Sequence, residues 1–233
     1  MCFVKFSHSL VRFFSAATVL GLLMFLPQSG LAAGRTGNVY AMTNQSTGNF
    51  IRVYHRDARG LLTFVDSVAT GGNGVGTGGD PLASQGAVVL SGDNRLLFAV
   101  NAGSNSVSVF AVSGDTLTLL DTVSSGGTLP VSLTVRDDLL YVLNAGGTPN
   151  ISGFTIDSPT NQLAPLAGST RNLPGGTTAA PAQVSFSPDG SVLVVTEKGT
   201  NQIDTFVVDD DGVAQPGVSF PSGGTTPFGI AAR

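Results

Sequence analysis

The chain has 233 residues, which is enough for one or two domains. Charged residues make up 11% of it and hydrophobic residues 42%, a balance that argues against a disordered chain, which would be polar and strongly charged. The net charge of −4 argues against a nucleic-acid binder, and the 31 glycines are scattered rather than periodic, which excludes collagen. We expect a globular protein with many turns.

Residues 1–33 have the layout of a secretory signal peptide. Lys5 and Arg12 lie in a basic start, an apolar run extends from Ala16 to Leu26, and small residues follow up to Ala33. This apolar run is shorter than the ~20 residues that span a bilayer core, although an uncleaved membrane anchor remains the alternative. We expect export to the periplasm, the cell surface or the medium, with no membrane span after cleavage.

The remainder of the chain, residues 34–233, contains internal repeats. Each repeat has an apolar run, a polar turn and a second run with period-two alternation, which is typical of paired strands. The four repeats begin at Val39, Leu97, Leu140 and Leu193. Each is followed by a Gly-Gly pair, at residues 71–72, 126–127, 175–176 and 223–224.

Another strand completes each repeating unit. In three units an apolar strand begins at a proline after the Gly-Gly pair, at Pro130, Pro181 and Pro227. A tight turn such as Asp189-Gly190 then leads back to the next repeat. Four antiparallel strands in roughly 48 residues are typical of a β-propeller blade. A sandwich of unrelated hairpins is the alternative, but it does not account for the aligned Gly-Gly pairs. We therefore predict an all-β propeller of four-stranded antiparallel blades.

Three stretches carry a resemblance to a known family. LLYVLNAG, SFSPDGSVLVVTEKGTNQID and GGTTPFGIAA resemble the lactonase-like β-propellers, which are described as 6-phosphogluconolactonase-like or carboxymuconate-cyclase-like and neighbour the YVTN-repeat propellers. The resemblance covers nearly all of residues 34–233. It implies a seven-bladed ring and, for the enzymatic members, lactone chemistry.

The number of blades leaves two alternatives open. Seven blades of ~45 residues need about 315 residues, more than residues 34–233 supply. We expect about four blades of a seven-bladed ring, in a domain that is C-terminally incomplete. Alternatively, the terminal PFGIAAR supplies the leading strand that the first repeat lacks, and the ring closes with four blades.

The strand order predicts where a site would form. If strands A to D run from the propeller axis outward, then the B–C turns and the D–A loops lie at one end, which we call the upper end. The candidate ligand-binding residues there are Asn44, Asn101, Asn144, Lys198 and Asn201. The alternative for the asparagines is that their side chains shape Asx turns.

Glu197 is the candidate catalytic residue. It is the only Glu of the chain and follows the B strand of the fourth repeat, where a carboxylate could act as a general base. The resemblance implies the same role, since a Glu on this motif is among the suspected active-site residues of the family. A solvated Glu-Lys turn is the alternative.

Other features weaken the enzymatic interpretation. Enzymatic members of the resembled family carry His residues before an SPDG strand, whereas this chain has Ala182 and Gln183 there. The upper end has few cations for a phosphate group, so a phosphorylated substrate is not expected. The G-x-G-x-x-G spelling at residues 74–79 is not followed by a helix, and Asp209 to Asp211 fit a hairpin turn. We expect no metal ion and no cofactor.

Three functions follow from these features. The first is an exported propeller that binds a small polar ligand, or a protein or cell-surface partner, without catalysis. The second is a lactone hydrolase or lactonising enzyme that uses Glu197 as general base on a non-phosphorylated substrate. The third is a structural repeat domain of a cell-surface protein.

Overall fold

The computed structural model describes residues 34–76 and 82–231, and the residues from Gly34 on form one compact unit. The predicted signal peptide, residues 1–33, lies outside the described residues. The described residues form sixteen strands and one single-turn 3-10 helix, η1 (Gly176–Thr178), so the prediction of an all-β protein is confirmed. All strand pairs are antiparallel.

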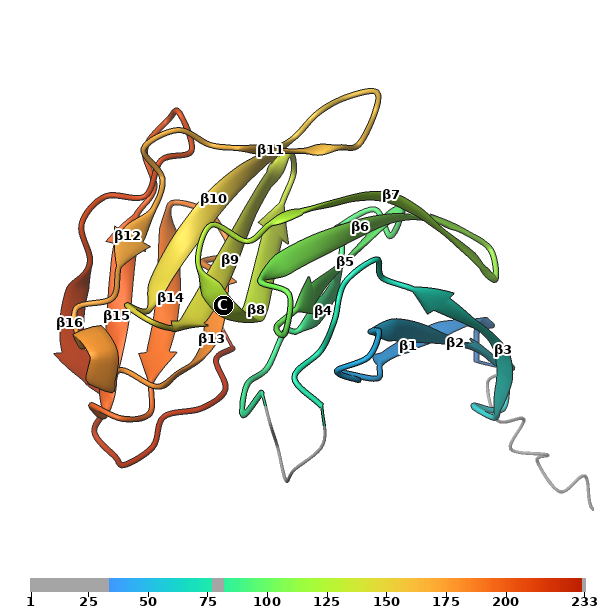
Figure 1. The fold of residues 1–233 in the computed structure, drawn as a ribbon, viewed down its shortest axis with the longest axis horizontal. Helices are drawn as coiled ribbons and strands as arrows, with labels where there is room; N and C mark the ends of the chain where they lie inside the picture. The colour runs from blue at the N-terminus through green and yellow to red at the C-terminus, as the bar shows by residue number, and fades with distance from the viewer. Residues whose placement is uncertain (1–33, 77–81, 232–233) are drawn as a thin grey trace, which may run out of the picture. The chain divides into compact units, whose positions relative to one another are not determined.

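The strands form four sheets that follow one another along the chain (Figure 1). The first is β1 (Gly37–Met42), β2 (Phe50–Arg56) and β3 (Leu62–Ala69). The second is β4 (Val88–Leu90), β5 (Leu96–Asn101), β6 (Ser106–Ser113) and β7 (Thr116–Ser124). The third is β8 (Thr128–Arg136), β9 (Leu139–Gly146), β10 (Asn150–Ile156), β11 (Leu163–Pro165) and β12 (Arg171–Asn172). The fourth is β13 (Pro181–Phe186), β14 (Val192–Glu197), β15 (Gln202–Val207) and β16 (Val218–Pro221).

These sheets are the predicted blades, numbered 1 to 4. Strands β4, β8 and β13 are the A strands, and β8 lies beside both β4 and β13, which places the A strands together. In blade 3, β11 and β12 both pair with β10 and together occupy the D position. Blade 1 has no A strand among the described residues, as the first repeat predicts.

Three apolar clusters fill the seams between consecutive blades. The seam of blades 1 and 2 contains Ile51 and Phe110, and the seam of blades 2 and 3 contains Phe98 and Phe154. The seam of blades 3 and 4 contains Tyr141, Leu143, Phe186, Leu193 and Phe206. Because each blade has two faces that meet neighbours, its strands carry apolar side chains on both faces.

The A–B turns at the lower end are held by short side chains. Asp189 accepts hydrogen bonds from the Ser187 and Ser191 hydroxyls and from the Ser191 amide, and these bonds lower the pKa of Asp189 to about 2. Gly190 adopts a φ of +75°, which favours glycine. The Asp-Gly pair thus forms the turn that its sequence predicts.

The outer face of blade 4 is uncovered in the described part of the chain. Val207, Val218 and Phe220 are 58%, 55% and 51% exposed on this face. The segment 227–231 lies against blade 4 and forms no strand: the Ile230 amide donates to Gln183 Oε1 at 2.8 Å, and Thr196 Oγ1 donates to the Phe228 carbonyl at 2.8 Å.

Candidate functional site

The predicted site residues at the ends of the B strands are buried. Asn101, Asn144 and Glu197 each have 0% exposure, and each lies in a strand rather than in the following turn. A glycine of the preceding D–A loop packs directly on each side chain, so closely that a Cβ on the glycine would lie 2.0–2.6 Å from it. The pairs are Gly72 with Asn101, Gly127 with Asn144, and Gly175 with Glu197. These side chains therefore fasten each blade to the loop that enters it.

Hydrogen bonds around the two asparagines support this fastening role. Asn101 accepts a bond from Thr70 Oγ1 at 2.6 Å and donates to Ser108 Oγ at 2.7 Å. Asn144 donates to the Ser125 carbonyl at 3.1 Å and to Asn150 Oδ1 at 2.9 Å. The sequence placed both asparagines at the upper end, but their position on the buried face of a strand depends on the packing of consecutive blades.

Glu197 is enclosed in the same way. Its Oε1 accepts a bond from the Gly175 amide at 3.0 Å, and its Oε2 accepts a bond from Thr200 Oγ1. The carboxyl is therefore not the solvated group of a Glu-Lys turn.

Asp204 is a residue of this region that the sequence did not single out. It lies on β15 with 0% exposure, and burial together with the adjacent Glu197 carboxyl raises the pKa of Asp204 to about 7. The sequence pattern could have identified it. Asp204 is an acidic residue at an inward position of an alternating strand, next to Ile203 and on the same face as Phe206. Glu197 and Asp204 thus form a buried carboxyl pair in blade 4.

Asn44, Asn105 and Asn201 occupy the B–C turns in the left-handed conformation, with φ values of +55°, +54° and +57°. The side-chain oxygen of each accepts a bond from an amide of the segment that leads from the same blade into the next A strand. The donors are the amides of Val75, Leu129 and Thr226, at 3.1, 2.8 and 2.7 Å. These asparagines connect the B–C turns to the loops that lead into the next A strand.

We expect Asn105→Gly and Asn105→Ala to separate two contributions of this turn. Asn105→Gly removes the bond to Leu129 and should lower the free energy of unfolding by about 1 kcal/mol. Asn105→Ala also places a Cβ in the left-handed region without a compensating side-chain bond, which should cost about 1–2 kcal/mol more. Urea unfolding of both variants measures the difference. An alanine variant that is more stable than the glycine variant would contradict this account.

Lys198 follows Glu197 and contacts groups outside blade 4's B strand. Its ammonium donates to the Ala83 carbonyl and lies 5.1 Å from the centroid of the Phe228 ring. Of the predicted upper-end residues, Glu197 and Lys198 are thus adjacent in sequence but are directed to different surroundings.

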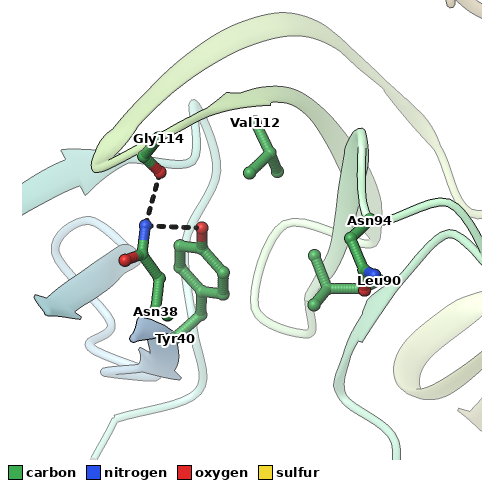
Figure 2. Close-up of a pocket in the computed structure, with 7 residues that line it drawn as sticks. Asn38, Tyr40, Leu90, Asn94, Val112 and Gly114 are labelled. Atoms are coloured by element: carbon green, nitrogen blue, oxygen red, sulfur yellow. Dashed lines mark hydrogen bonds between the residues drawn. The ribbon is translucent and has the colours of Figure 1, made fainter. Parts of the chain in front are cut away.

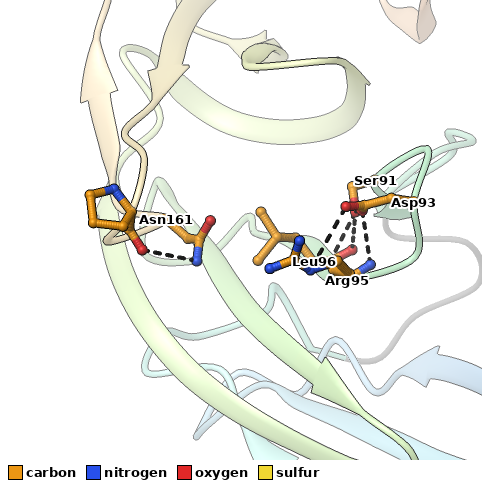
Figure 3. Close-up of polar contacts among 6 residues, drawn as sticks. Ser91, Asp93, Arg95, Leu96 and Asn161 are labelled. Atoms are coloured by element: carbon orange, nitrogen blue, oxygen red, sulfur yellow. Dashed lines mark hydrogen bonds and ion pairs between the residues drawn. The ribbon is translucent and has the colours of Figure 1, made fainter.

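Within residues 34–76 and 82–231, four cavities of about 310–360 Å³ lie at the lower end, away from the predicted site. One lies between blades 1 and 2, where Asn38 donates to the Gly114 carbonyl and to the Tyr40 hydroxyl (Figure 2). Another lies between blades 2 and 3. Its wall includes Asp93, which accepts bonds from Ser91 Oγ and the Arg95 amide (Figure 3).

The remaining two cavities have acidic walls. They include the aspartates of the A–B and C–D turns: Asp93, Asp137, Asp138, Asp157, Asp209, Asp210 and Asp211. Asp209 itself accepts a bond from the Val213 amide at 2.8 Å and forms the expected hairpin turn. No group of three or more His, Cys, Asp or Glu side chains arranged to hold a metal ion is found within residues 34–76 and 82–231.

Comparisons with known proteins identify a family with this architecture. The family model described as "Lactonase, 7-bladed beta-propeller" matches residues 51–176. A search of curated protein sequences gives no match. Within the described residues, no helix is long and apolar enough to cross a membrane.

Solved structures share the fold. A protein of unknown function from Desulfotomaculum acetoxidans has a TM-score of 0.59 and 16% identity, over 83% of this chain and 60% of that one. The periplasmic gluconolactonase PpgL of Pseudomonas aeruginosa has a TM-score of 0.55 and 21% identity, over 82% and 55%. A protein assigned as a 6-phosphogluconolactonase from Bacteroides fragilis has a TM-score of 0.53 and 13% identity, over 76% and 53%. The present chain therefore spans at most 60% of the length of these three proteins.

Proposed function

Because the chain belongs to the lactonase family of seven-bladed β-propellers, we propose that it is an exported propeller whose upper end binds a small polar ligand or a partner without catalysis by Glu197. The observation that carries this proposal is the complete burial of Glu197, the candidate general base. A general base needs a lone pair within hydrogen-bonding reach of the proton that it removes. The Glu197 oxygens instead accept bonds from Gly175 and Thr200, beneath the loop that enters blade 4.

The exposed groups of the upper loops indicate the chemistry of the ligand. They are uncharged rather than charged, and include hydroxyl and amide side chains: Ser104, Thr128, Thr148, Thr177, Thr178, Gln45, Asn73 and Asn201. Hydroxyl and amide side chains both donate and accept hydrogen bonds, and both roles suit a neutral ligand rich in hydroxyl or carbonyl groups. A sugar or a non-phosphorylated sugar lactone has this chemistry.

Export is part of the same proposal. It is supported by the signal-peptide layout of residues 1–33 and agrees with the periplasmic location of the Pseudomonas aeruginosa relative. It would be tested by N-terminal sequencing of the protein recovered from outside the cytoplasm, with cleavage expected near Ala33.

Hydrolysis of a non-phosphorylated lactone is the second candidate function. Family membership favours it, as do two structural relatives that are described as lactonases. This candidate requires Glu197 to leave its buried position and reach a ligand at the upper end.

A panel of lactones, with and without a phosphate group, distinguishes the candidates. We expect calorimetry to detect binding of a non-phosphorylated member, and we expect no turnover that depends on Glu197. The variant Glu197→Gln keeps the size of the side chain, and Asp189→Asn at the lower end is the matched control.

Turnover that Glu197→Gln abolishes while Asp189→Asn keeps it would overturn the non-catalytic proposal. Circular dichroism of each variant establishes that the fold is retained. Neither binding nor turnover across the panel would instead favour a structural repeat domain of a cell-surface protein.

A further inference from the structure

Blades 2, 3 and 4 each contain a polar cluster at the same place, and its side chains in blade 4 differ from those in blades 2 and 3. In each blade this cluster has a side chain from the end of the B strand, one from the C strand and a hydroxyl from the D strand or the residue beside it. The sets are Asn101, Ser108 and Thr122 in blade 2, Asn144, Ser152 and Thr170 in blade 3, and Glu197, Asp204 and Ser219 in blade 4. Two neutral side chains are thus replaced by two carboxyl groups.

The Asp204 carboxyl has one oxygen that lacks a donor. Its Oδ1 accepts a bond from Ser219 Oγ, whereas its buried Oδ2 has no hydrogen-bond partner in the described part of the chain. The Glu197 carboxyl is its neighbour on the same face of the sheet, because Asp204 pairs with Val195, two residues before Glu197 on β14. Two ionised carboxylates that are neighbours in a buried site would repel each other strongly, whereas one added proton allows a hydrogen bond between them.

Titratable side chains on β14, β12 and β9 have hydrogen-bond partners outside the pair. Lys198, which follows β14, directs its ammonium to the Ala83 carbonyl. Arg171 on β12 donates to the Gly168 and Thr170 carbonyls, and the Tyr141 hydroxyl on β9 donates to the Gly212 carbonyl. The direct neighbours Gly175, Thr200 and Ser219 are uncharged. The hydrogen bonds named here for the three titratable side chains are all made to groups other than the two carboxyls.

We propose that Glu197 and Asp204 share one proton in the folded protein. This proton stabilises the contact between blades 3 and 4 at the upper end. Glu197 holds the amide of Gly175, and the chain continues from Gly175 through η1 to the exposed hydroxyls of Thr177 and Thr178. Loss of the proton forces the carboxylates apart and releases this loop. The stability of the contact between blades 3 and 4 at the upper end therefore depends on pH. This holds whether or not a ligand binds at that end.

The direction in which the free energy of unfolding changes with pH follows from the raised pKa of Asp204. Its pKa is about 7 in the folded protein, above the ordinary value of 3.8. The stabilisation from the shared proton is therefore complete below about pH 4 and is lost as the pH rises through about 7. Between these limits the unfolding equilibrium constant should increase by up to about tenfold per pH unit.

The single Glu of the chain permits a direct measurement on the wild-type protein. With ¹³C-labelled glutamate, the side-chain carboxyl of Glu197 gives the only resonance of its kind, because residue 197 is the only Glu in the sequence. We expect this resonance to respond when the neighbouring Asp204 loses its proton near pH 7, together with a lower protection factor of the Gly175 amide against hydrogen exchange. A resonance that does not respond near pH 7, with the protection factor of the Gly175 amide unchanged between pH 5 and 8, would overturn the proposal.

A double variant tests the shared proton through the pH dependence of the free energy of unfolding. Glu197→Asn with Asp204→Ser reproduces the side chains that blade 2 has at these positions, Asn101 and Ser108. We expect this variant to lose the fall in stability between pH 5 and 8 that the wild type shows, while Asp189→Asn keeps it. Identical pH profiles for the wild type and the double variant would contradict the proposal. If the double variant does not fold, the wild-type titration decides.

Discussion

Phe206→Ala should lower the free energy of unfolding by about 3–5 kcal/mol, the typical cost of removing a buried phenyl ring from a core. Phe206 is 0% exposed on β15 and belongs to the apolar cluster between blades 3 and 4, where the Gly217 backbone also packs on its ring. The variant leaves a cavity in a seam where both neighbouring sheets have fixed backbones. Collapse of these sheets onto the cavity would be limited, so most of the cost should remain.

Phe220→Ala is the matched control for this prediction. Phe220 lies on the adjacent strand β16 of the same blade and is 51% exposed, so its substitution should change the free energy of unfolding by less than about 1 kcal/mol. Denaturant unfolding followed by circular dichroism measures both variants. Equal losses for the two would show that the seam of blades 3 and 4 is not packed as described.

Gly199→Ala should be strongly destabilising, by about 2–4 kcal/mol, because overpacking against backbone forces the chain to move. A Cβ on Gly199 would lie 2.0 Å from the carbonyl oxygen of Thr178, and the Gly199 amide donates to the Ala179 carbonyl at 2.9 Å. The B–C turn of blade 4 thus packs on the loop that enters the same blade, with no space for a methyl group. In blade 2, a Cβ built on Gly103 would likewise lie 2.0 Å from the Gly74 carbonyl oxygen.

Gly92→Ala is the control for the glycine prediction. Gly92 lies in an exposed A–B turn, and a Cβ there would meet no atom within 4 Å. We expect its unfolding midpoint to equal that of the wild type within about 0.5 kcal/mol. If Gly199→Ala also left the free energy of unfolding unchanged, the two loops at the upper end of blade 4 would have to be further apart than the structure places them.

The blade boundaries were predictable because their signals are local. Period-two alternation at Ile203 to Val207 predicts β15, and the Asp189-Gly190 pair predicts the turn before β14. The alignment of the Gly-Gly pairs was less accurate. The glycine that packs on Glu197 is Gly175, the first of its pair, whereas Gly72 and Gly127 are the second of theirs. This shift of one residue depends on how the loop meets the blade, and repeat spacing does not reveal it.

The sequence by itself determined the all-β class, the four repeats and the position of the upper end, because strand period and turn composition act over a few neighbouring residues. Only the tertiary structure decided what the upper-end residues do. Glu197 and Asp204 are seven positions apart and become neighbours through the register of β14 and β15, and the loop at Gly175 excludes them from solvent. Burial and a neighbouring carboxyl then give Asp204 a raised pKa, and both are consequences of three-dimensional packing.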